Sequence, residues 1–409
     1  MSAPAHLRVA IVAESFLPHV NGVSNSVLRI LEHLRASGHE AIVIAPGAHG
    51  RDPNHPEISH YAGFRIVRVP TIRLPFVDSL PIGLPTPTVF RTLKEFAPDI
   101  VHLASPFALG RGGGWAARRL KIPRVAVFQT DIAGFAGRYR LGVLQRATWR
   151  WIRRMHNHCQ LTLAPSTETI RQLEAHGVEN LARWGRGVDT ELFHPDKRSE
   201  RLRRNWIGQR PQSTTVVGYV GRLAAEKGVH RLATLAGRDD IQLVIVGDGP
   251  CRSELEAAMP NAVFCGALSG SDLAAAYASF DVFVHPGELE TFCQTIQEAQ
   301  ASGVPTIAPR VGGPVDLIRD DSNRSPDDYT GNPDDCNGLL LDPDNFEAEL
   351  ADAVSWLAAP SRRQELSAAA RKHVEGKTWP RICAQLVDYY REVLAEVNPA
   401  AWDSPGANH

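Results

Sequence analysis

Two glutamates, Glu290 and Glu298, stand eight residues apart in the stretch ELETFCQTIQEA. The segment before them, FDVFVHP at 280–286, is apolar and typical of a buried strand. The residues after Glu290 have helical spacing as far as Gly303, a residue type that commonly ends a helix. We therefore expect Glu290 in a strand-to-helix loop and Glu298 about two turns along the helix. In open α/β sheets ligands bind at the carboxyl ends of the strands, so this pair could hold a ligand; solvated helix charges are the alternative.

Two cations, Arg222 and Lys227, stand five residues apart in GYVGRLAAEKG, directly after another predicted strand. A planar guanidinium and an ammonium point charge together suit a diphosphate, whereas ordinary surface charges on a loop are the alternative. Two glycine-containing loops offer backbone that could meet an anion. These are RVGGP at 310–314 and VNGVS at 20–24, where Gly22 would let a ligand approach closely.

Strands and helices alternate along the chain, which predicts parallel sheets covered by helices on both faces. The first series of strands is LRVAIVAE, HEAIVIAPG, GFRIVRVP, PDIVHLASP and IPRVAVFQTD. The pattern restarts at STTVVGYVGRL and continues with IQLVIVGDGP, NAVFCGAL, FDVFVHPGE and GVPTIAPRVGG. A highly charged stretch near 195–212 marks the joint. We expect two doubly wound Rossmann-like domains, 1–195 and 196–378, and a C-terminal amphipathic helix and tail at 379–409.

The composition is that of an ordinary globular protein, with 43% hydrophobic and 22% charged residues in 409. That length suggests two domains. The six cysteines show no CxxC spacing and are interpreted as reduced thiols. No segment resembles a signal peptide, and no apolar run approaches the ~18 residues of a membrane span. We therefore expect a cytoplasmic protein.

The charge is unevenly distributed between the two halves of the chain. Residues 1–195 hold 23 Lys and Arg against 14 Asp and Glu, whereas the remainder holds 21 against 31. The basic half includes RYRLGVLQRATWRWIRRMHNH at 138–158, which interleaves arginines with Trp149 and Trp151. Such a helix suits an anionic membrane surface, and a packing helix with a solvated basic face is the alternative. The Pro-rich, apolar stretch 71–90 is predicted to be a loop and is a second candidate membrane contact. The residues expected to meet acceptor or membrane are Arg150, Arg153 and Arg154.

The motifs GRLAAEKG, VGDGP, FCG and GELETFCQTIQEAQASGVPTIAPRVGG resemble the C-terminal half of glycosyltransferase family 4, retaining enzymes with the GT-B fold. The family's E-x7-E pair falls on Glu290 and Glu298. RVAIVAESFLPHVNGVSNSV, VHLASP, FQTDIAGFA and RGVDTELFHP are similar to the actinobacterial GDP-mannose-dependent α-mannosyltransferases. The resemblance covers nearly the whole chain. It implies an α/β fold of two Rossmann-like domains facing a central cleft, with the C-terminal helix crossing back to the first domain.

The same resemblance implies an activity and a location. The enzyme would transfer mannose from GDP-mannose to a membrane glycolipid of the glucuronosyl diacylglycerol or phosphatidylinositol mannoside type, in envelope glycolipid and lipomannan biosynthesis. It would be peripheral on the inner face of the plasma membrane. Transfer would proceed by same-face attack, with the departing diphosphate oxygen taking the acceptor proton, because the implied position of Glu290 makes it a poor nucleophile.

The resemblance also assigns roles to individual residues. Arg222 and Lys227 would hold the diphosphate, Glu298 would accept hydrogen bonds from the ribose, and the base would lie near Val263–Ala267. Glu290, with the backbone of Phe292 and Cys293, would contact the donor sugar. The expected donor-binding set is Gly22, Arg222, Lys227, Val263, Glu290, Phe292, Cys293 and Glu298.

The chain departs from the family pattern in two places. Gln129 occupies a position where many relatives have histidine, and an amide cannot act as a base, so Asp131 is the nearest carboxylate that could assist. The acidic insert 319–337 contains six aspartates but lacks ordered calcium-ligand spacing, and we interpret it as a solvated loop. We expect no essential metal or cofactor, with GDP-mannose as substrate only. The expected catalytic set is Glu290, Arg222, Lys227, Gln129 and Asp131.

Other functions fit the sequence less well. A dinucleotide-dependent oxidoreductase is disfavoured because the first strand-to-helix turn lacks G-x-G-x-x-G. A non-catalytic sugar-nucleotide-binding protein is disfavoured because both glutamates and both cations are present. Nucleic acid is not an expected partner, since no recognised binding module appears. The alternative within the transferases is a UDP-sugar enzyme of the sulfoquinovosyl or glucosyl type.

Overall fold

The computed structural model describes seven segments of the chain, namely residues 6–18, 21–47, 58–72, 82–104, 107–129, 142–320 and 336–397. The chain forms two compact units, described separately below. Unit 1 comprises Met1–Gly185 and Pro380–His409, and unit 2 comprises Arg186–Trp379. The change between units at 185/186 lies ten residues before the limit expected from the sequence.

Unit 1 is built on a sheet in which β1 (Arg8–Val12) lies between β2 (Glu40–Pro46) and β7 (Ile100–Leu103). The strand order is β10-β9-β8-β7-β1-β2-β4-β3, and all pairs are parallel except β3 with β4. The remaining strands of this sheet are β3 (His60–Tyr61), β4 (Phe64–Val69), β8 (Arg124–Val127), β9 (Leu161–Ala164) and β10 (Leu181–Arg183). Apart from the edge strand β3, chain order runs outward in both directions from the β1–β7 pair. This pair is therefore the switch point of the sheet, where an open α/β sheet commonly binds ligands.

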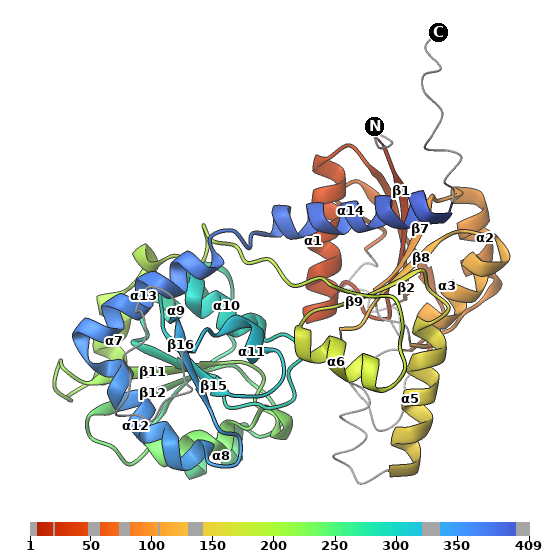
Figure 1. Cartoon of the computed structure of the whole chain (residues 1–409). Coiled ribbons are helices and arrows are strands. Elements are labelled where there is room, and N and C mark those ends of the chain that lie inside the picture. The colour runs from red at the N-terminus through yellow and green to blue at the C-terminus, as the bar shows by residue number, and fades with distance from the viewer. Residues whose placement is uncertain are drawn as a thin grey trace. The chain divides into compact units, whose positions relative to one another are not determined.

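Helices of unit 1 alternate with these strands (Figure 1). They are α1 (Gly22–Ala36), α2 (Pro87–Phe96), α3 (Ala108–Arg119), α5 (Gly142–His156), α6 (Thr167–Ala175) and α14 (Trp379–Val397). The Asn21 side chain begins α1 by accepting hydrogen bonds from the N–H groups of Val23 and Ser24.

The prediction that 71–90 is a loop throughout is wrong. β5 (Thr71–Ile72) pairs with β6 (Ile82–Gly83), and α2 begins at Pro87. Proline is favoured in the first turn of a helix because its missing N–H has no intrahelical partner there. The stretch 73–81 lies outside the described residues.

The C-terminal helix α14 belongs to unit 1, as the sequence predicted. The Tyr390 hydroxyl lies 2.7 Å from Nδ1 of His102, a buried residue of β7. Trp184 donates its indole N–H to the carbonyl of Ile382 at 2.9 Å. Because both contacts are buried or half-buried, they fix the helix against β7, which borders the switch point, and against the residue that follows β10 at the edge of the sheet.

Unit 2 contains a wholly parallel sheet with the order β13-β12-β11-β14-β15-β16. Its strands are β11 (Thr215–Val220), β12 (Ile241–Val246), β13 (Val263–Gly266), β14 (Val282–Val284), β15 (Thr306–Pro309) and β16 (Gly338–Leu341). Its helices are η1 (Pro195–Lys197), α7 (Glu200–Ile207), η2 (Ala225–Lys227), η3 (Val229–Leu235), α8 (Arg252–Ala258), α9 (Gly270–Ala278), α10 (Gln294–Ala301), α11 (Pro314–Leu317), α12 (Phe346–Ala358) and α13 (Pro360–Val374). The switch point lies between the neighbouring strands β11 and β14.

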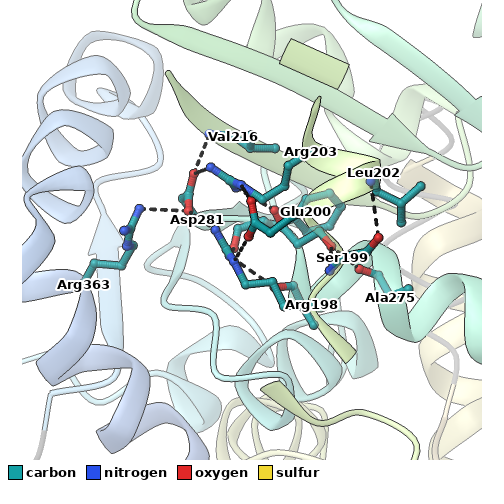
Figure 2. Close-up of polar contacts among 12 residues, drawn as sticks. Arg198, Ser199, Glu200, Leu202, Arg203, Val216, Ala275, Asp281 and Arg363 are labelled. Carbon is teal, nitrogen blue, oxygen red and sulfur yellow. Dashed lines mark hydrogen bonds and ion pairs between the residues drawn. The ribbon is translucent and has the colours of Figure 1, made fainter. Parts of the chain in front are cut away.

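A buried carboxylate fixes the amino ends of these two strands (Figure 2). Asp281, which precedes β14, accepts hydrogen bonds from the Val216 N–H of β11 at 2.9 Å and from Arg363 of α13 at 2.8 Å. Arg203 of α7 and Arg198 also pair with this carboxylate, at 2.8 and 3.3 Å. The arginines compensate the buried charge, so the amino ends of β11 and β14 are held together. Their carboxyl ends carry the predicted site.

No helix in the described part of the chain is long and apolar enough to cross a membrane.

Candidate active site

The two loops that carry Lys227 and Glu290 leave adjacent strands at the switch point of unit 2. Lys227 ends η2 in the loop after β11, and Glu290 lies between β14 and α10. Glu298 lies within α10, as expected. The sequence therefore placed both glutamates on the correct elements, because an apolar strand followed by helical spacing defines this edge of a parallel sheet.

Glu290 is the centre of a charged cluster. Its Oε1 lies 2.5 Å from Nζ of Lys227 and 3.4 Å from Nε2 of the buried His285. Burial opposes ionisation, but the His285 imidazole and the Lys227 ammonium outweigh it and lower the pKa of Glu290 to about 2. Glu290 is therefore ionised at neutral pH and can accept hydrogen bonds from hydroxyl groups.

His285 was not identified from the sequence. It directly follows β14, its ring stacks on that of Tyr219, and Glu290 and Cys293 lie beside it. Burial favours the neutral imidazole, but the Cys293 and Glu290 side chains outweigh it and raise the pKa of His285 to about 10. A histidine at the end of a predicted buried strand was the available signal, and its neighbours become evident only in the fold.

Glu298 has a different environment. Its Oε2 accepts a hydrogen bond from the buried Tyr277 hydroxyl at 2.9 Å. Burial raises the pKa of Glu298 to about 7, although the Tyr277 hydroxyl acts in the opposite direction. The preceding residue, Gln297, donates to the carbonyl of Arg186 at 3.0 Å and so fixes the helix that carries Glu298.

The loop around Glu290 is held in an unusual backbone conformation. Cys293, at the start of α10, has a φ of 75°, a left-handed value that is uncommon for residues other than glycine. Gly313 donates its N–H to the carbonyl of Glu290 at 2.7 Å. A Cβ on Gly313 would lie 2.4 Å from Cα of Phe292, so only glycine permits this approach. The RVGGP loop, which the sequence suggested as an anion site, thus has a structural use here, and the Gly313 N–H is already bonded.

Arg231 is a second residue that the sequence analysis missed. Its Nη1 lies 2.7 Å from Oε1 of Glu288, and its Nε lies 2.8 Å from Oε1 of Glu347 at the start of α12. The guanidinium also lies 4.4 Å from the ring centroid of Phe346. These contacts fix the loop that carries Glu290 to α12, so Arg231 is a positioning residue.

The other donor-binding residues predicted for unit 2 lie in the described part of the chain and, unlike Lys227, are not ion-paired with Glu290. The Arg222 side chain is 57% exposed, and the ion partner of its guanidinium among the described residues is Glu226 at 3.7 Å. Phe292 and Cys293 are buried beside Glu290. Val263 begins β13 and pairs with Val244. The structure thus brings Lys227 to Glu290, whereas Arg222 remains on the exposed side of the same loop.

Three of the residues predicted for catalysis or donor binding belong to unit 1. Gly22 is the first residue of α1, and the two N–H groups that follow it are already capped by Asn21. Gln129 follows β8 and is buried, with its amide donating to the carbonyl of Ala104 at 2.7 Å. Asp131 lies outside the described residues.

Glu14 is a buried carboxylate at the switch point of unit 1, and the sequence analysis did not select it. It follows β1, is 3% exposed, and accepts a hydrogen bond from the Gly110 N–H of α3 at 2.8 Å. Its Oε2 has no hydrogen-bond partner among the residues that the structure describes. Burial raises the pKa of Glu14 to about 7 against the opposing effect of these backbone amides. A carboxylate directly after the first strand was the signal available in the sequence.

The Glu14→Gln substitution is expected to stabilise the protein at pH 8 more than at pH 5. The folded-state pKa lies above the unfolded value, so the favourable contribution of the protonated group is lost as the pH rises through about 7. Glutamine mimics the protonated carboxyl and avoids this loss, which amounts to about 2–3 kcal/mol. Thermal unfolding of both proteins at the two pH values measures the effect. An equal difference in melting temperature at pH 5 and pH 8 would contradict the buried titration.

The acidic insert is only partly described. Asp320 is not solvated as predicted, because its buried carboxylate accepts hydrogen bonds from the Leu340 N–H at 2.9 Å and from Arg310 at 3.0 Å. Residues 321–335 lie outside the described part. Within the segments that the structure describes, no group of three or more His, Cys, Asp or Glu side chains could hold a metal ion.

Helix α5 carries the three arginines predicted to meet acceptor or membrane. Arg150, Arg153 and Arg154 are exposed. Trp149, which the sequence interleaves with these arginines, is buried and stacks on His176 at a centroid distance of 3.7 Å. The helix thus packs through Trp149 and exposes its arginines.

Two Rossmann-like units in one chain have the architecture of the GT-B class of glycosyltransferases, and the Lys–Glu–His cluster lies at the switch point of the second unit. The family model described as Glycosyltransferase Family 4 matches residues 20–192, and that described as Glycosyl transferases group 1 matches residues 214–359. The chain therefore belongs to glycosyltransferase family 4. This confirms the fold class, the family and the enzyme class expected from the sequence.

Similar proteins support this placement. The GDP-mannose-dependent alpha-mannosyltransferase of Corynebacterium glutamicum is 56% identical over 389 residues, covering 95% of this chain and 90% of its own. The enzyme of the same name from Mycolicibacterium smegmatis is 54% identical, covering 95% and 98%. The GDP-mannose-dependent alpha-(1-6)-phosphatidylinositol dimannoside mannosyltransferase of Mycobacterium tuberculosis is 28% identical, covering 93% and 95%. Among solved structures, Anabaena HepE in complex with UDP has a TM-score of 0.74 at 18% identity and covers 94% of this chain and 100% of its own.

Proposed function

We propose that the protein transfers mannose from GDP-mannose to a membrane glycolipid with retention of configuration. The observation that carries the proposal is the 2.5 Å contact between Lys227 and Glu290. A sugar nucleotide joins its diphosphate directly to the sugar, so a site for it needs a cation for the phosphates beside an acceptor for the sugar hydroxyls. Lys227 and Glu290 supply this pair at the carboxyl end of a parallel sheet.

Each of the predicted donor-binding side chains of unit 2 has a defined role in this proposal. An ammonium has three donors, so Lys227 can remain paired with Glu290 while it donates to a diphosphate oxygen. Ionised Glu290 accepts hydrogen bonds from the mannose hydroxyls, and Glu298 accepts them from the ribose. Arg222, whose side chain is exposed, moves onto the diphosphate when the donor binds. The guanine lies against β13, near Val263.

Retention follows from attack on the face that the diphosphate leaves. The bond between the anomeric carbon and the diphosphate oxygen breaks as the acceptor hydroxyl oxygen forms its bond to the same carbon. The hydroxyl proton passes to the departing diphosphate oxygen, which becomes part of GDP. Lys227 and Arg222 stabilise the charge that develops on the diphosphate. Unit 1 binds the acceptor, with Gln129 and Asp131 as the proposed contacts.

The relatives favour this donor and this class of acceptor. Two relatives more than 50% identical to the chain carry GDP-mannose in their names, and a more distant one is named for a phosphatidylinositol mannoside. The basic character of residues 1–195 suits an anionic membrane, where such lipids reside. We place the protein on the inner face of the plasma membrane as a peripheral enzyme.

Chelation of divalent ions is expected to leave activity largely intact. The proposal assigns the charge of the leaving diphosphate to Lys227 and Arg222, so it requires no metal. Transfer rates measured with and without EDTA test this expectation. Complete loss of activity that Mg²⁺ or Mn²⁺ restores would show that a divalent cation also stabilises the leaving diphosphate.

The donor and acceptor classes can be tested together. The purified protein is incubated with actinobacterial membranes and radiolabelled GDP-mannose or, in parallel, labelled UDP-glucose or UDP-sulfoquinovose. The proposal predicts label in extracted lipid from GDP-mannose, and about 10²- to 10³-fold slower labelling with the Glu290→Gln protein. Incorporation from a UDP-sugar alone would favour the sulfoquinovosyl or glucosyl alternative.

A further inference from the structure

Unit 1 contains a strongly basic cavity between helices α3 and α5. Figure 1 shows these two helices, α3 in orange and α5 in yellow. Its volume is about 550 Å³, and Leu103 of β7, Cys159 and Arg124 of β8 form part of its wall. No carboxylate is among its lining residues in the described part of the chain. The arginines that line it are Arg111, Arg118, Arg124, Arg150 and Arg154.

The charges of these arginines are not compensated within the described residues. Arg124 is 8% exposed, its Nε has no hydrogen-bond partner, and its Nη1 reaches only the carbonyl of Gly114 at 3.4 Å. Burial lowers the pKa of Arg124, and the Arg118 charge acts in the same direction against the opposing thiol of Cys159. Clustered like charges with a buried, unsatisfied donor destabilise a fold unless an anion binds them. The cavity therefore has the composition of an anion site.

The cavity is also amphipathic. Trp151 and Met155 contribute apolar wall, and Trp115 of α3 lies at its rim with 58% of its surface exposed. Trp115 also lines a second cavity of about 770 Å³ between α2 and α3, where Phe90 lies 6.3 Å from it. A small hydrophilic anion would gain nothing from contact with an exposed indole, whereas an indole is favoured at the boundary between lipid and water.

We propose that the cavity between α3 and α5 binds the phosphate-bearing headgroup of an anionic membrane lipid, with Trp115 at the membrane interface. The guanidiniums can donate paired hydrogen bonds to phosphate oxygens, and the apolar wall meets the start of the acyl chains. The inference rests on the proposed function only in placing the acceptor in a membrane. It replaces a general attraction of basic residues to the bilayer by a defined binding site.

The arginines of α5 provide a matched control for this site. Arg150 and Arg154 are four residues apart, share one face of the helix and line the cavity. Arg153 lies beside Gly177 and lines a different hollow with Trp149 and His176, which Arg150 also borders. Of these two hollows, Arg154 lines only the α3–α5 cavity. A diffuse electrostatic attraction depends on the number of charges and would treat Arg153 and Arg154 alike. Binding of a lipid headgroup in the cavity depends far more on Arg154, which lines it, than on Arg153.

The experiment measures cosedimentation of the full chain with vesicles at about 0.15 M salt, where the screening length is about 8 Å. Vesicles contain phosphatidylcholine with or without phosphatidylglycerol, and neither donor nor acceptor is present. The test variant is Arg118→Gln with Arg154→Gln, and the control is Arg153→Gln with Arg171→Gln, which removes the same charge. GDP affinity and circular dichroism verify the fold of each variant.

The proposal predicts binding to vesicles with phosphatidylglycerol, weakened about 100-fold in the test variant and at most about five-fold in the control. Equal losses in the two variants, or equal binding to neutral vesicles, would overturn it. Micromolar binding of soluble glycerol phosphate by calorimetry, without preference for anionic vesicles, would identify a free phosphate compound as the ligand and also overturn it. The outcome is independent of the donor assay, so failure of this site and failure of mannosyl transfer are distinguishable.

Tryptophan fluorescence provides a second readout. Brominated phosphatidylglycerol is expected to quench part of the emission of the wild-type protein, and this part should disappear in Trp115→Phe. Quenching that is unchanged in Trp115→Phe would show that Trp115 does not lie at the membrane and would contradict the proposed orientation.

Discussion

Turnover of the Glu290→Gln protein is expected to fall by about 10²- to 10³-fold, the scale for loss of one preorganised contact to the transition state. Glutamine retains the size of the side chain but removes the charge that lies between Lys227 and His285. The positive groups then lose their shared partner, and the sugar hydroxyls lose their strongest acceptor. Because the amide fills the same volume, the fold should remain intact.

The kinetic measurement should separate kcat from KM with GDP-mannose as donor. Glu256→Gln, an exposed glutamate of α8 paired with Arg252, is a suitable control because it makes the same chemical change far from the cluster in sequence. Turnover of Glu290→Gln within three-fold of the wild type, with an unchanged melting temperature, would remove Glu290 from the sugar site.

The Lys227→Ala substitution is expected to weaken GDP binding and to lower turnover, each by about 10- to 100-fold. A hydrogen bond to a charged group contributes about 1.5–3 kcal/mol, and the bound donor and the departing GDP both carry the charge that Lys227 meets. The substitution also leaves Glu290 with His285 as its cationic neighbour, so the pKa of Glu290 should rise.

Calorimetry with GDP tests this expectation without the need for an acceptor. Lys227→Arg should recover part of the affinity, because a guanidinium retains the charge but differs in geometry. Lys372→Ala, in α13, is the charge-matched control. GDP affinity that is the same in Lys227→Ala and the wild type would mean that the diphosphate binds elsewhere.

Much of the fold could be predicted from the sequence because its signals are local. Apolar strands alternate with amphipathic helices, and the position of Glu290 follows from the residues on either side of it. The stretch 71–90 was wrongly predicted because prolines that usually indicate a loop also begin a helix, as Pro87 does for α2.

The residues that were missed depend on contacts between distant parts of the chain. His285 acquires its role from Tyr219 and Glu290, and Arg231 acquires its role from Glu288 and Glu347. Tyr219 and both partners of Arg231 are far from these positions along the chain, and although Glu290 is close to His285 in sequence, only the fold shows that the two side chains meet. Burial that raises a pKa, as in Glu14, likewise depends on how the whole sheet packs.

The basic helix α5 illustrates a further limit. The sequence predicted that Arg150, Arg153 and Arg154 act together, but adjacent helical residues point about 100° apart. Arg154 lines the α3–α5 cavity, whereas Arg153 lies beside Gly177. A count of charges therefore indicates that the surface is basic but not which arginines share a site.

The central claim is that the switch point of unit 2 holds the donor, and a crystal structure of the protein with GDP-mannose tests it most directly. The account predicts mannose hydroxyls within hydrogen-bond distance of Glu290, the ribose at Glu298, and a diphosphate oxygen bound by Lys227. Density for the diphosphate away from the loop after β11, or for the mannose away from Glu290, would contradict it.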